Sequence, residues 1–122
     1  MKNPGEILKA AKSKGKYAGV SLLITESLDL LAPYWEQLDI VTLVGTAMGI
    51  KGASMDASVP EKVRRARRII AERGLKTEIE VDGGIRRETV PLISAAGADW
   101  IVPGSLMFKE DPPTMREWLK TL

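Results

Sequence analysis

The chain has 122 residues, 44% of them hydrophobic, and a formal net charge of +2 at pH 7. It contains no cysteine and no histidine, which excludes disulfides and thiolate metal sites and leaves any acid–base work to Asp, Glu, Lys or Tyr. The small charge does not indicate nucleic acid and no segment reaches the roughly 18 apolar residues of a membrane span, so we expect one cytoplasmic domain over residues 1–122.

Helical and strand-like segments alternate along the chain. In order, the patterns predict a helix over residues 4–15, a strand over 18–24, a helix over 26–38, a strand over 40–45, a helix over 60–73, a strand over 77–81, a helix over 86–97, a strand over 99–104 and a helix over 112–122. The first expected strand is a mostly apolar run bounded by turn residues, which is typical of a strand buried on both faces. This alternation predicts a parallel sheet with right-handed crossovers.

Local signals mark several of the element ends. Asn3 followed by Pro4 and Glu6 is typical of a helix N-terminus, and the apolar stripe that follows ends near Gly15. Pro33 indicates a bend or a break within the helix expected over residues 26–38, because proline has no N–H to donate.

The helix expected over residues 60–73 has the clearest amphipathic pattern. Gly74 marks its end, and a Glu61 to Arg65 pair is expected on its exposed side. Its basic run over residues 64–68 (RRARR) is interrupted by Ala66 and balanced by acids, so we interpret it as a solvated outer face and not as a nucleic-acid site. The expected core positions are Val63, Ala66 and Ile70.

Glycines follow three of the four expected strands. The positions are Gly45 with Gly49 and Gly52, Asp82 with Gly83 and Gly84, and Gly104 with Ser105. The carboxyl ends of parallel strands meet at one rim, and in (β/α)8 barrels that rim carries the chemistry. The pattern therefore favours an α/β fold of the TIM-barrel type, here about half a barrel of four parallel strands with helices, over a small doubly wound sheet.

These glycines predict a phosphate site. Without side chains, Gly83, Gly84 and Gly104 would let phosphate oxygens reach backbone N–H groups, and Ser105 adds a hydroxyl donor. Asp82 is then a candidate for acid–base chemistry beside that site. The alternative is that Asp82 caps the helix that follows it.

The order of these motifs resembles that of the ribulose-phosphate 3-epimerase family. The segment IEVDGGIRRETVPLISAAGADWIVPGS, which begins at Ile79, is similar to the family's last strands, and LDIVTLVGTAMGIKGASMD resembles the strand and phosphate-covering loop before them. AGVSLLITES is similar to the strand before that. The resemblance covers residues 17–108 and corresponds to the C-terminal half of a ribulose-phosphate-binding TIM barrel.

The resemblance implies an isomerase that interconverts D-ribulose 5-phosphate and D-xylulose 5-phosphate, a reaction of pentose phosphate metabolism. Family members move a proton on and off C3 with two aspartates, often around a divalent metal, here zinc, iron(II) or manganese. Asp82 corresponds to one of these aspartates, which is both acid–base and metal ligand. The corresponding phosphate-binding positions are Gly49, Gly52, Gly83, Gly84, Gly104 and Ser105.

Departures from the family pattern leave the sugar open. The family's second catalytic aspartate and its two metal-binding histidines lie on earlier strands, which this chain lacks. The loop reads GIKG where the family usually has GFGG. A related ketose phosphate such as allulose 6-phosphate therefore stays possible, as does a non-catalytic half-barrel that only binds phosphate.

Four strands also raise a physical problem. A half-barrel exposes two sheet edges and the side chains meant to fill a barrel interior. Three explanations compete: the chain is a fragment of a longer protein, it pairs with a separate half-barrel, or two copies form a homo-oligomeric barrel. In each case the expected partners are a sugar phosphate and the further strands of a barrel. We expect the chain on its own to be inactive.

Overall fold

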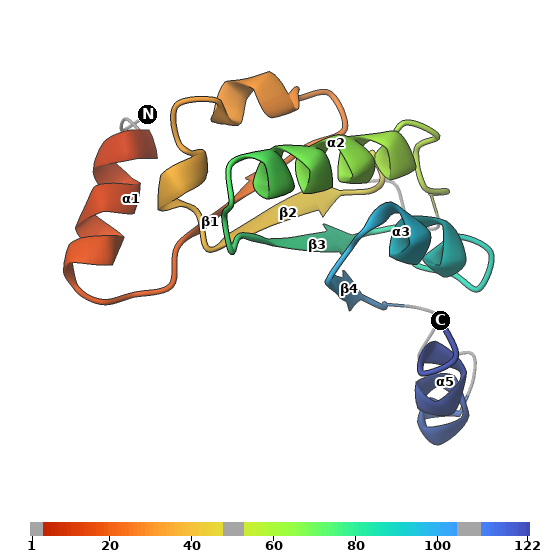
Figure 1. The fold of residues 1–122 in the computed structure, drawn as a ribbon. Coiled ribbons are helices and arrows are strands. Elements are labelled where there is room, and N and C mark those ends of the chain that lie inside the picture. Colours follow the sequence, from red (N-terminus) through yellow and green to blue (C-terminus); the bar gives the residue numbers. More distant parts are fainter. Residues whose placement is uncertain (1–3, 48–52, 105–110) are drawn as a thin grey trace.

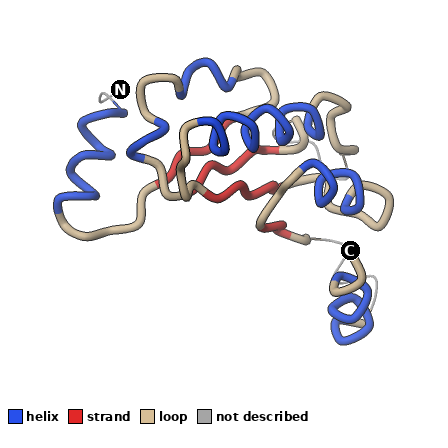
Figure 2. Tube along the Cα trace, in the orientation of Figure 1, coloured by secondary structure: helices blue, strands red, loops and turns tan. Residues whose placement is uncertain are grey.

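The computed structural model describes residues 4–47, 53–104 and 111–122, in which helices and strands alternate (Figure 1, Figure 2). The elements are α1 (Pro4–Ser13), β1 (Gly19–Leu22), the 3-10 helices η1 (Leu28–Leu31) and η2 (Trp35–Gln37), β2 (Ile40–Val44), α2 (Val59–Glu72), β3 (Glu78–Asp82), α3 (Val90–Ala96), β4 (Trp100–Val102) and α5 (Pro112–Leu119). The predicted alternation is confirmed. The cap expected from Asn3 lies outside the described residues.

The strands form one parallel sheet in chain order, β1-β2-β3-β4. Ile40 pairs with both Gly19 and Glu78, so the first three strands start level with one another. Helices α2 and α3 lie side by side over one face of the sheet (Figure 1). Four parallel strands alternating with helices make half of an α/β barrel, as the sequence predicts.

The two faces of the sheet have different environments. Val41 and Leu43 of β2, and Ile79 and Val81 of β3, point toward the helices and are fully buried. Alternate residues point to the other face, because side chains alternate along a strand. There Thr42 and Val44 are half-buried, Asp82 is exposed, and Trp100 and Val102 are 55% and 40% exposed. One face is therefore a packed core, and the other is largely uncovered.

The helix expected over residues 26–38 is wrong. The segment forms two separate 3-10 helices, η1 and η2, joined by a turn. Pro33 has no N–H, so the ladder of α-helical hydrogen bonds cannot pass it, and the Ala32 N–H already bonds the Asp29 carbonyl at 3.2 Å in the tighter pattern. The apolar side chains still enter the core, where Trp35 is 1% exposed.

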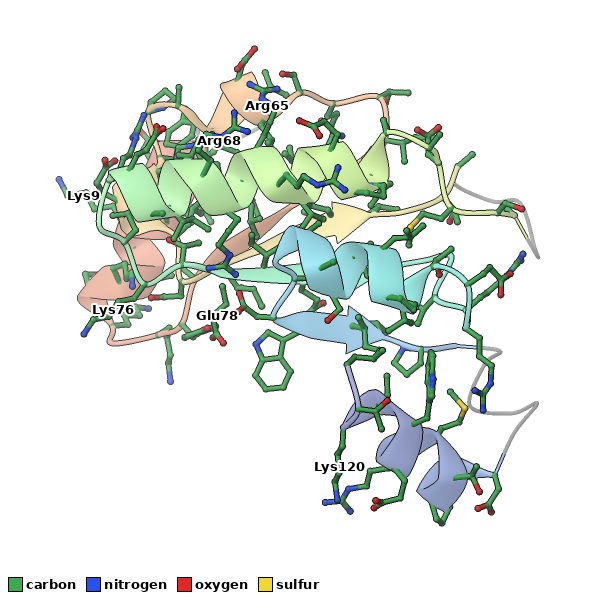
Figure 3. All side chains as sticks on the ribbon, turned by 45° about the vertical axis from the view of Figure 1, so that its right-hand side comes forward. Lys9, Arg65, Arg68, Lys76, Glu78 and Lys120 are labelled. Atoms are coloured by element: carbon green, nitrogen blue, oxygen red, sulfur yellow. The ribbon has the colours of Figure 1, made fainter. Side chains whose placement is uncertain are left out.

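Helix α2 (Val59–Glu72) begins and ends one residue before the predicted range 60–73, and it differs from its prediction in one ion pair. Val63, Ala66 and Ile70 are buried, and Gly74 follows the helix with φ +64°. The expected Glu61 to Arg65 pair is wrong. Glu61 pairs instead with Arg64 at 3.1 Å, and Arg65 reaches Asp29 of η1 at 3.3 Å, because the acidic η1 lies close by. Figure 3 shows Arg65 on the outer side of α2, which supports the interpretation of the basic run over residues 64–68 as a solvated face.

The turn between α3 and β4 is clamped to α2. Gly97 ends α3 with φ +113°, and its carbonyl accepts two hydrogen bonds from the Arg67 guanidinium, at 3.1 and 2.7 Å. The same guanidinium bonds the Asp99 carboxylate, which also accepts from the Ile79 N–H of β3 at 2.8 Å. The segment AGAD at residues 96–99 therefore has a structural role, because its contacts join two helices and two strands.

The closing helix α5 lies beyond β4 (Figure 1). Met115 on its inner side is fully buried. The guanidinium of Arg87 lies 4.7 Å from the centre of the Trp118 ring, a cation–π contact, and its Nη2 is 3.8 Å from the Met115 sulfur. These contacts hold α5 against the turn before α3.

Asp39 ties helix α1 to the sheet and makes stability depend on pH. Its carboxylate accepts from Lys12 at 2.6 Å and from the Ala18 N–H at 2.7 Å, which lowers the pKa of Asp39. A carboxyl whose pKa is lower in the folded state stabilises above its unfolded pKa of about 4 and loses this effect as pH falls through the folded value. We expect Asp39→Asn to melt at a lower temperature than the parent at pH 7, with the difference shrinking below pH 4. A pH-independent difference in thermal melts would contradict this role.

Candidate active site at the carboxyl ends of the strands

The carboxyl ends of β2, β3 and β4 meet at one rim, as predicted. Val44, Asp82 and Val102 are paired across the three strands, so their side chains point to the same, uncovered face. Asp82 is exposed and is the one carboxylate among these three. The alternative role as a helix cap is not what the structure shows, because the N-cap of α3 is Thr89.

The two glycines after Asp82 are required by the backbone. Gly83 and Gly84 have φ of +105° and +72°, a region that side chains disfavour. A Cβ on Gly84 would lie 2.7 to 2.9 Å from Met55, including its backbone, and one on Gly83 would lie 2.9 Å from the Thr46 hydroxyl. The DGG motif therefore packs tightly against the loop that follows β2. The phosphate-binding role of these glycines stays a prediction.

Gly84→Ala and Gly104→Ala test whether the close packing at Gly84 contributes to stability. Gly84→Ala combines a disfavoured φ with a clash against backbone, so we expect a loss of about 1–3 kcal/mol in the free energy of unfolding. Gly104 is the matched control: a Cβ there meets nothing within 4 Å, and we expect a change within about 0.5 kcal/mol. Urea unfolding followed by circular dichroism measures both. If Gly84→Ala lowered the free energy of unfolding no more than Gly104→Ala does, the close contact of Gly84 with Met55 would not contribute to stability.

Hydrogen bonds connect the rim loops. The Asp56 N–H donates to the Gly45 carbonyl at 2.8 Å, and the Arg86 guanidinium donates to the Ala53 carbonyl at 3.3 Å. The Thr89 hydroxyl donates to the Gly84 carbonyl at 2.6 Å. The loop after β2 is thereby held against the loop after β3. Arg86 was not singled out from the sequence, although its place directly after DGGI puts a cation at this rim.

The structure brings only part of the predicted site together. Asp82, Gly83 and Gly84 lie at the rim, and Gly104 is exposed just past β4. Gly49, Gly52 and Ser105 lie outside the described residues. Asp82 carries no side-chain hydrogen bond to any residue within 4–47, 53–104 or 111–122, so its carboxylate faces solvent.

The side chains of the described residues do not by themselves fit a metal ion. Over the ranges that the structure describes, no group of three or more His, Cys, Asp or Glu side chains could hold an ion. Divalent metals of the expected kinds take four or more ligands, of which Asp82 would be one. The metal that the resemblance implies would need ligands from elsewhere.

Two further acids share the face of Asp82 and were missed from the sequence. Glu78 and Glu80 stand at every second position of β3, so all three carboxylates point to the uncovered side. Glu78, labelled in Figure 3, is bonded by the Tyr17 hydroxyl and by the Trp100 indole at 2.7 Å, and its carboxylate raises the pKa of Tyr17 to about 12. Among the described residues, Glu80 accepts a hydrogen bond from the Thr42 hydroxyl alone, at 3.5 Å. The alternation of acidic and apolar residues in EIEVD could have indicated that the three carboxylates share one face of the strand.

None of the helices in the described ranges is both long enough and apolar enough to cross a membrane. The cytoplasmic location stays a prediction.

Comparison with known proteins agrees with this architecture. The sequence model of the ribulose-phosphate 3 epimerase family matches residues 1–108. The chain is 35% identical over 114 residues to the ribulose-phosphate 3-epimerase of Chlamydia pneumoniae, covering 92% of this chain and 50% of that protein. It is 34% identical over 102 residues to that of Bacillus subtilis, covering 83% and 47%. The chain therefore spans about half the length of these relatives.

A solved structure shows the same fold. The nicotinate-nucleotide pyrophosphorylase of Francisella tularensis superposes with a TM-score of 0.56 at 27% sequence identity, over 84% of this chain and 32% of that one. Its larger size again places this chain against part of a longer protein. With the family model matching nearly the whole sequence and the strand-end motifs in place, the chain belongs to the ribulose-phosphate 3-epimerase family.

Proposed function

We propose that this chain provides one half of the active site of a sugar-phosphate 3-epimerase, acting between ribulose 5-phosphate and xylulose 5-phosphate. The observation that carries the proposal is Asp82, an exposed carboxylate at the carboxyl end of β3, followed by two glycines of positive φ, in a chain of this family. Relatives twice as long carry the epimerase name. The activity assigned here belongs to the completed protein.

The proposed chemistry is proton transfer at C3. The C3 proton of a ketose 5-phosphate is next to the C2 carbonyl, so a carboxylate placed beside it can remove the proton while the carbonyl oxygen takes up negative charge. Asp82 is suited to this step because its oxygens are open to solvent and have no competing hydrogen bond from the described residues. Gly83, Gly84 and Gly104, with Gly49, Gly52 and Ser105, would hold the substrate phosphate.

Epimerisation requires a second acid–base group on the other side of the sugar. A proton removed from one face of C3 must return to the opposite face, and Asp82 reaches only one. Glu80 does not serve, because it projects from the same face of the same strand, about 7 Å further from the rim. We infer that the second group comes from strands beyond those described.

The same reasoning applies to the metal. We propose that a divalent ion assists this reaction, with Asp82 as one ligand and the others outside the described residues. Its contribution, when bound, is to stabilise negative charge on the substrate oxygens. The isolated chain is then inactive.

Deuterium incorporation tests the function. The chain is co-expressed with the part of the Bacillus subtilis relative that it does not match, and the purified complex is incubated in D2O with ribulose 5-phosphate or, separately, allulose 6-phosphate. We expect NMR to show deuterium at C3 of ribulose 5-phosphate. Incorporation into allulose 6-phosphate alone would move the assignment to that sugar. Binding of either sugar by the complex without incorporation would favour a phosphate-binding module that does no chemistry.

A further inference from the structure

Arg86 lies where the loop after β3 meets α3, and its backbone is held in place. Its N–H donates to the Thr89 hydroxyl at 2.9 Å, and its carbonyl accepts from the Thr89 N–H at 3.1 Å. The Thr89 hydroxyl also donates to the Gly84 carbonyl at 2.6 Å. The backbone of Arg86 is therefore fixed relative to the DGG motif over residues 82–84.

The Arg86 side chain reaches from this loop to the loop after β2. Its guanidinium donates to the Ala53 carbonyl at 3.3 Å, across 33 positions of sequence, and both residues are half-buried. A hydrogen bond from a charged donor is stronger than one between neutral groups, and partial burial reduces competition from water. This contact therefore fixes the start of the segment 53–56.

The segment 53–56 lies directly against the DGG motif. A Cβ on Gly84 would lie 2.8 Å from the Met55 Cα, so the two backbones are in contact. The Asp56 N–H donates to the Gly45 carbonyl at 2.8 Å, and the Gly45 N–H donates to the Asp82 carbonyl at 2.8 Å. Because the contacts are this close, a shift of the segment 53–56 would displace the backbone of the DGG motif.

We propose that Arg86 is a positioning residue for the substrate phosphate. By holding the segment 53–56 against Gly84, it keeps the N–H groups of Gly83 and Gly84 oriented for the phosphate oxygens. Such groups bind an anion more tightly when they are already oriented, because ordering them during binding costs free energy. Arg86 then acts on recognition, and Asp82 acts on the proton. This inference rests on the proposed function, since it concerns the phosphate of the same substrate.

Steady-state kinetics test the role of Arg86. The complex of this chain with the unmatched part of the Bacillus subtilis relative is prepared with Arg86→Met, which keeps an unbranched side chain but has no hydrogen-bond donor. We expect KM for ribulose 5-phosphate to rise by about tenfold or more and kcat to stay within about threefold of the parent. An unchanged KM would overturn the inference, whatever happens to kcat.

Arg64→Met is the matched control for Arg86→Met. Arg64 is an exposed arginine that pairs with Glu61 on α2 at 3.1 Å, and its replacement should change KM and kcat by less than about twofold. An equal rise of KM in both variants would mean that the loss of any positive charge is sufficient, and would overturn the positioning role.

Hydrogen exchange separates positioning from direct contact with the phosphate. The Asp56 N–H is bonded to the Gly45 carbonyl, so its exchange rate in D2O reports whether the segment 53–56 stays in place. In Arg86→Met without phosphate, we expect NMR to show exchange at least about fivefold faster at Asp56. The Ile79 N–H, bonded to the Asp99 carboxylate, should keep its parent rate. Weaker phosphate binding with unchanged exchange at Asp56 would mean that Arg86 contacts the phosphate itself, and would overturn positioning.

The two proposals fail separately, because calorimetric titration with inorganic phosphate needs no reaction. Weaker phosphate binding and faster Asp56 exchange in Arg86→Met, in a complex that incorporates no deuterium at C3, would support the role of Arg86 and refute the epimerase function. An active complex in which Arg86→Met has the parent's KM and phosphate affinity would confirm the function and refute the role of Arg86.

Discussion

Asp82→Asn lowers the rate of deuterium incorporation at C3 of ribulose 5-phosphate by about 10²- to 10⁴-fold in the completed enzyme, the range expected for loss of a general acid–base group. An amide has nearly the shape of a carboxylate but cannot accept the proton. Because Asp82 is exposed and its side chain bonds no described residue, the fold should be unchanged. NMR of the substrate in D2O measures the rate, and urea unfolding checks stability.

Asp29→Asn is the matched control. Asp29 is also an exposed aspartate, with 80% of its side chain accessible, but it lies on η1 and pairs with Arg65 at 3.3 Å. Its replacement should leave the incorporation rate within about twofold, because the ion pair is an exposed surface contact and Asp29 does not lie on β2, β3 or β4. If Asp82→Asn retained the parent rate, another group would have to move the C3 proton, and the acid–base assignment would be withdrawn.

Binding separates chemistry from recognition at the same residue. The affinity of the complex for ribulose 5-phosphate should change much less than the rate in Asp82→Asn, because the phosphate is expected to be held by backbone groups of other residues. Calorimetric titration measures this affinity. A parallel loss of affinity and rate would indicate that Asp82 acts in binding.

Trp35→Ala removes about 3–5 kcal/mol from the free energy of unfolding. Trp35 is 1% exposed and is the largest fully buried side chain of the described core. Its loss leaves a cavity in the described core. Domains of this size are stable by about 5–15 kcal/mol, so the substitution removes a large part of the stability of the folded state. Urea unfolding followed by far-ultraviolet circular dichroism measures the difference.

Leu30→Ala is the control for Trp35→Ala. Leu30 lies a few residues away on η1 but is 56% exposed, so its truncation removes little buried surface and should change stability by less than about 0.5 kcal/mol. If Trp35→Ala were as mild as Leu30→Ala, the segment 28–37 would not belong to the cooperative core.

The order of elements and the position of the rim could be predicted from the sequence. Apolar runs and turn residues are local signals, so the four parallel strands, helix α2 and the stop at Gly74 follow from short stretches of sequence. The DGG motif was likewise visible as a rim feature. Its tight packing was not, because Gly84 contacts Met55 of a loop about thirty residues earlier.

By itself, the sequence determined the fold class, the family and the place of Asp82 at the end of β3, since each depends on the order of residues along one strand or one motif. Tertiary structure decided the rest. The split of residues 26–38 into η1 and η2, the pairing of Arg65 with Asp29, and the half-buried position of Glu80 beside the exposed Asp82 depend on which elements lie next to each other. The physical reason is that the residue type gives a side chain's charge and shape. Its burial and its partners depend instead on strand register and on which surfaces other elements cover.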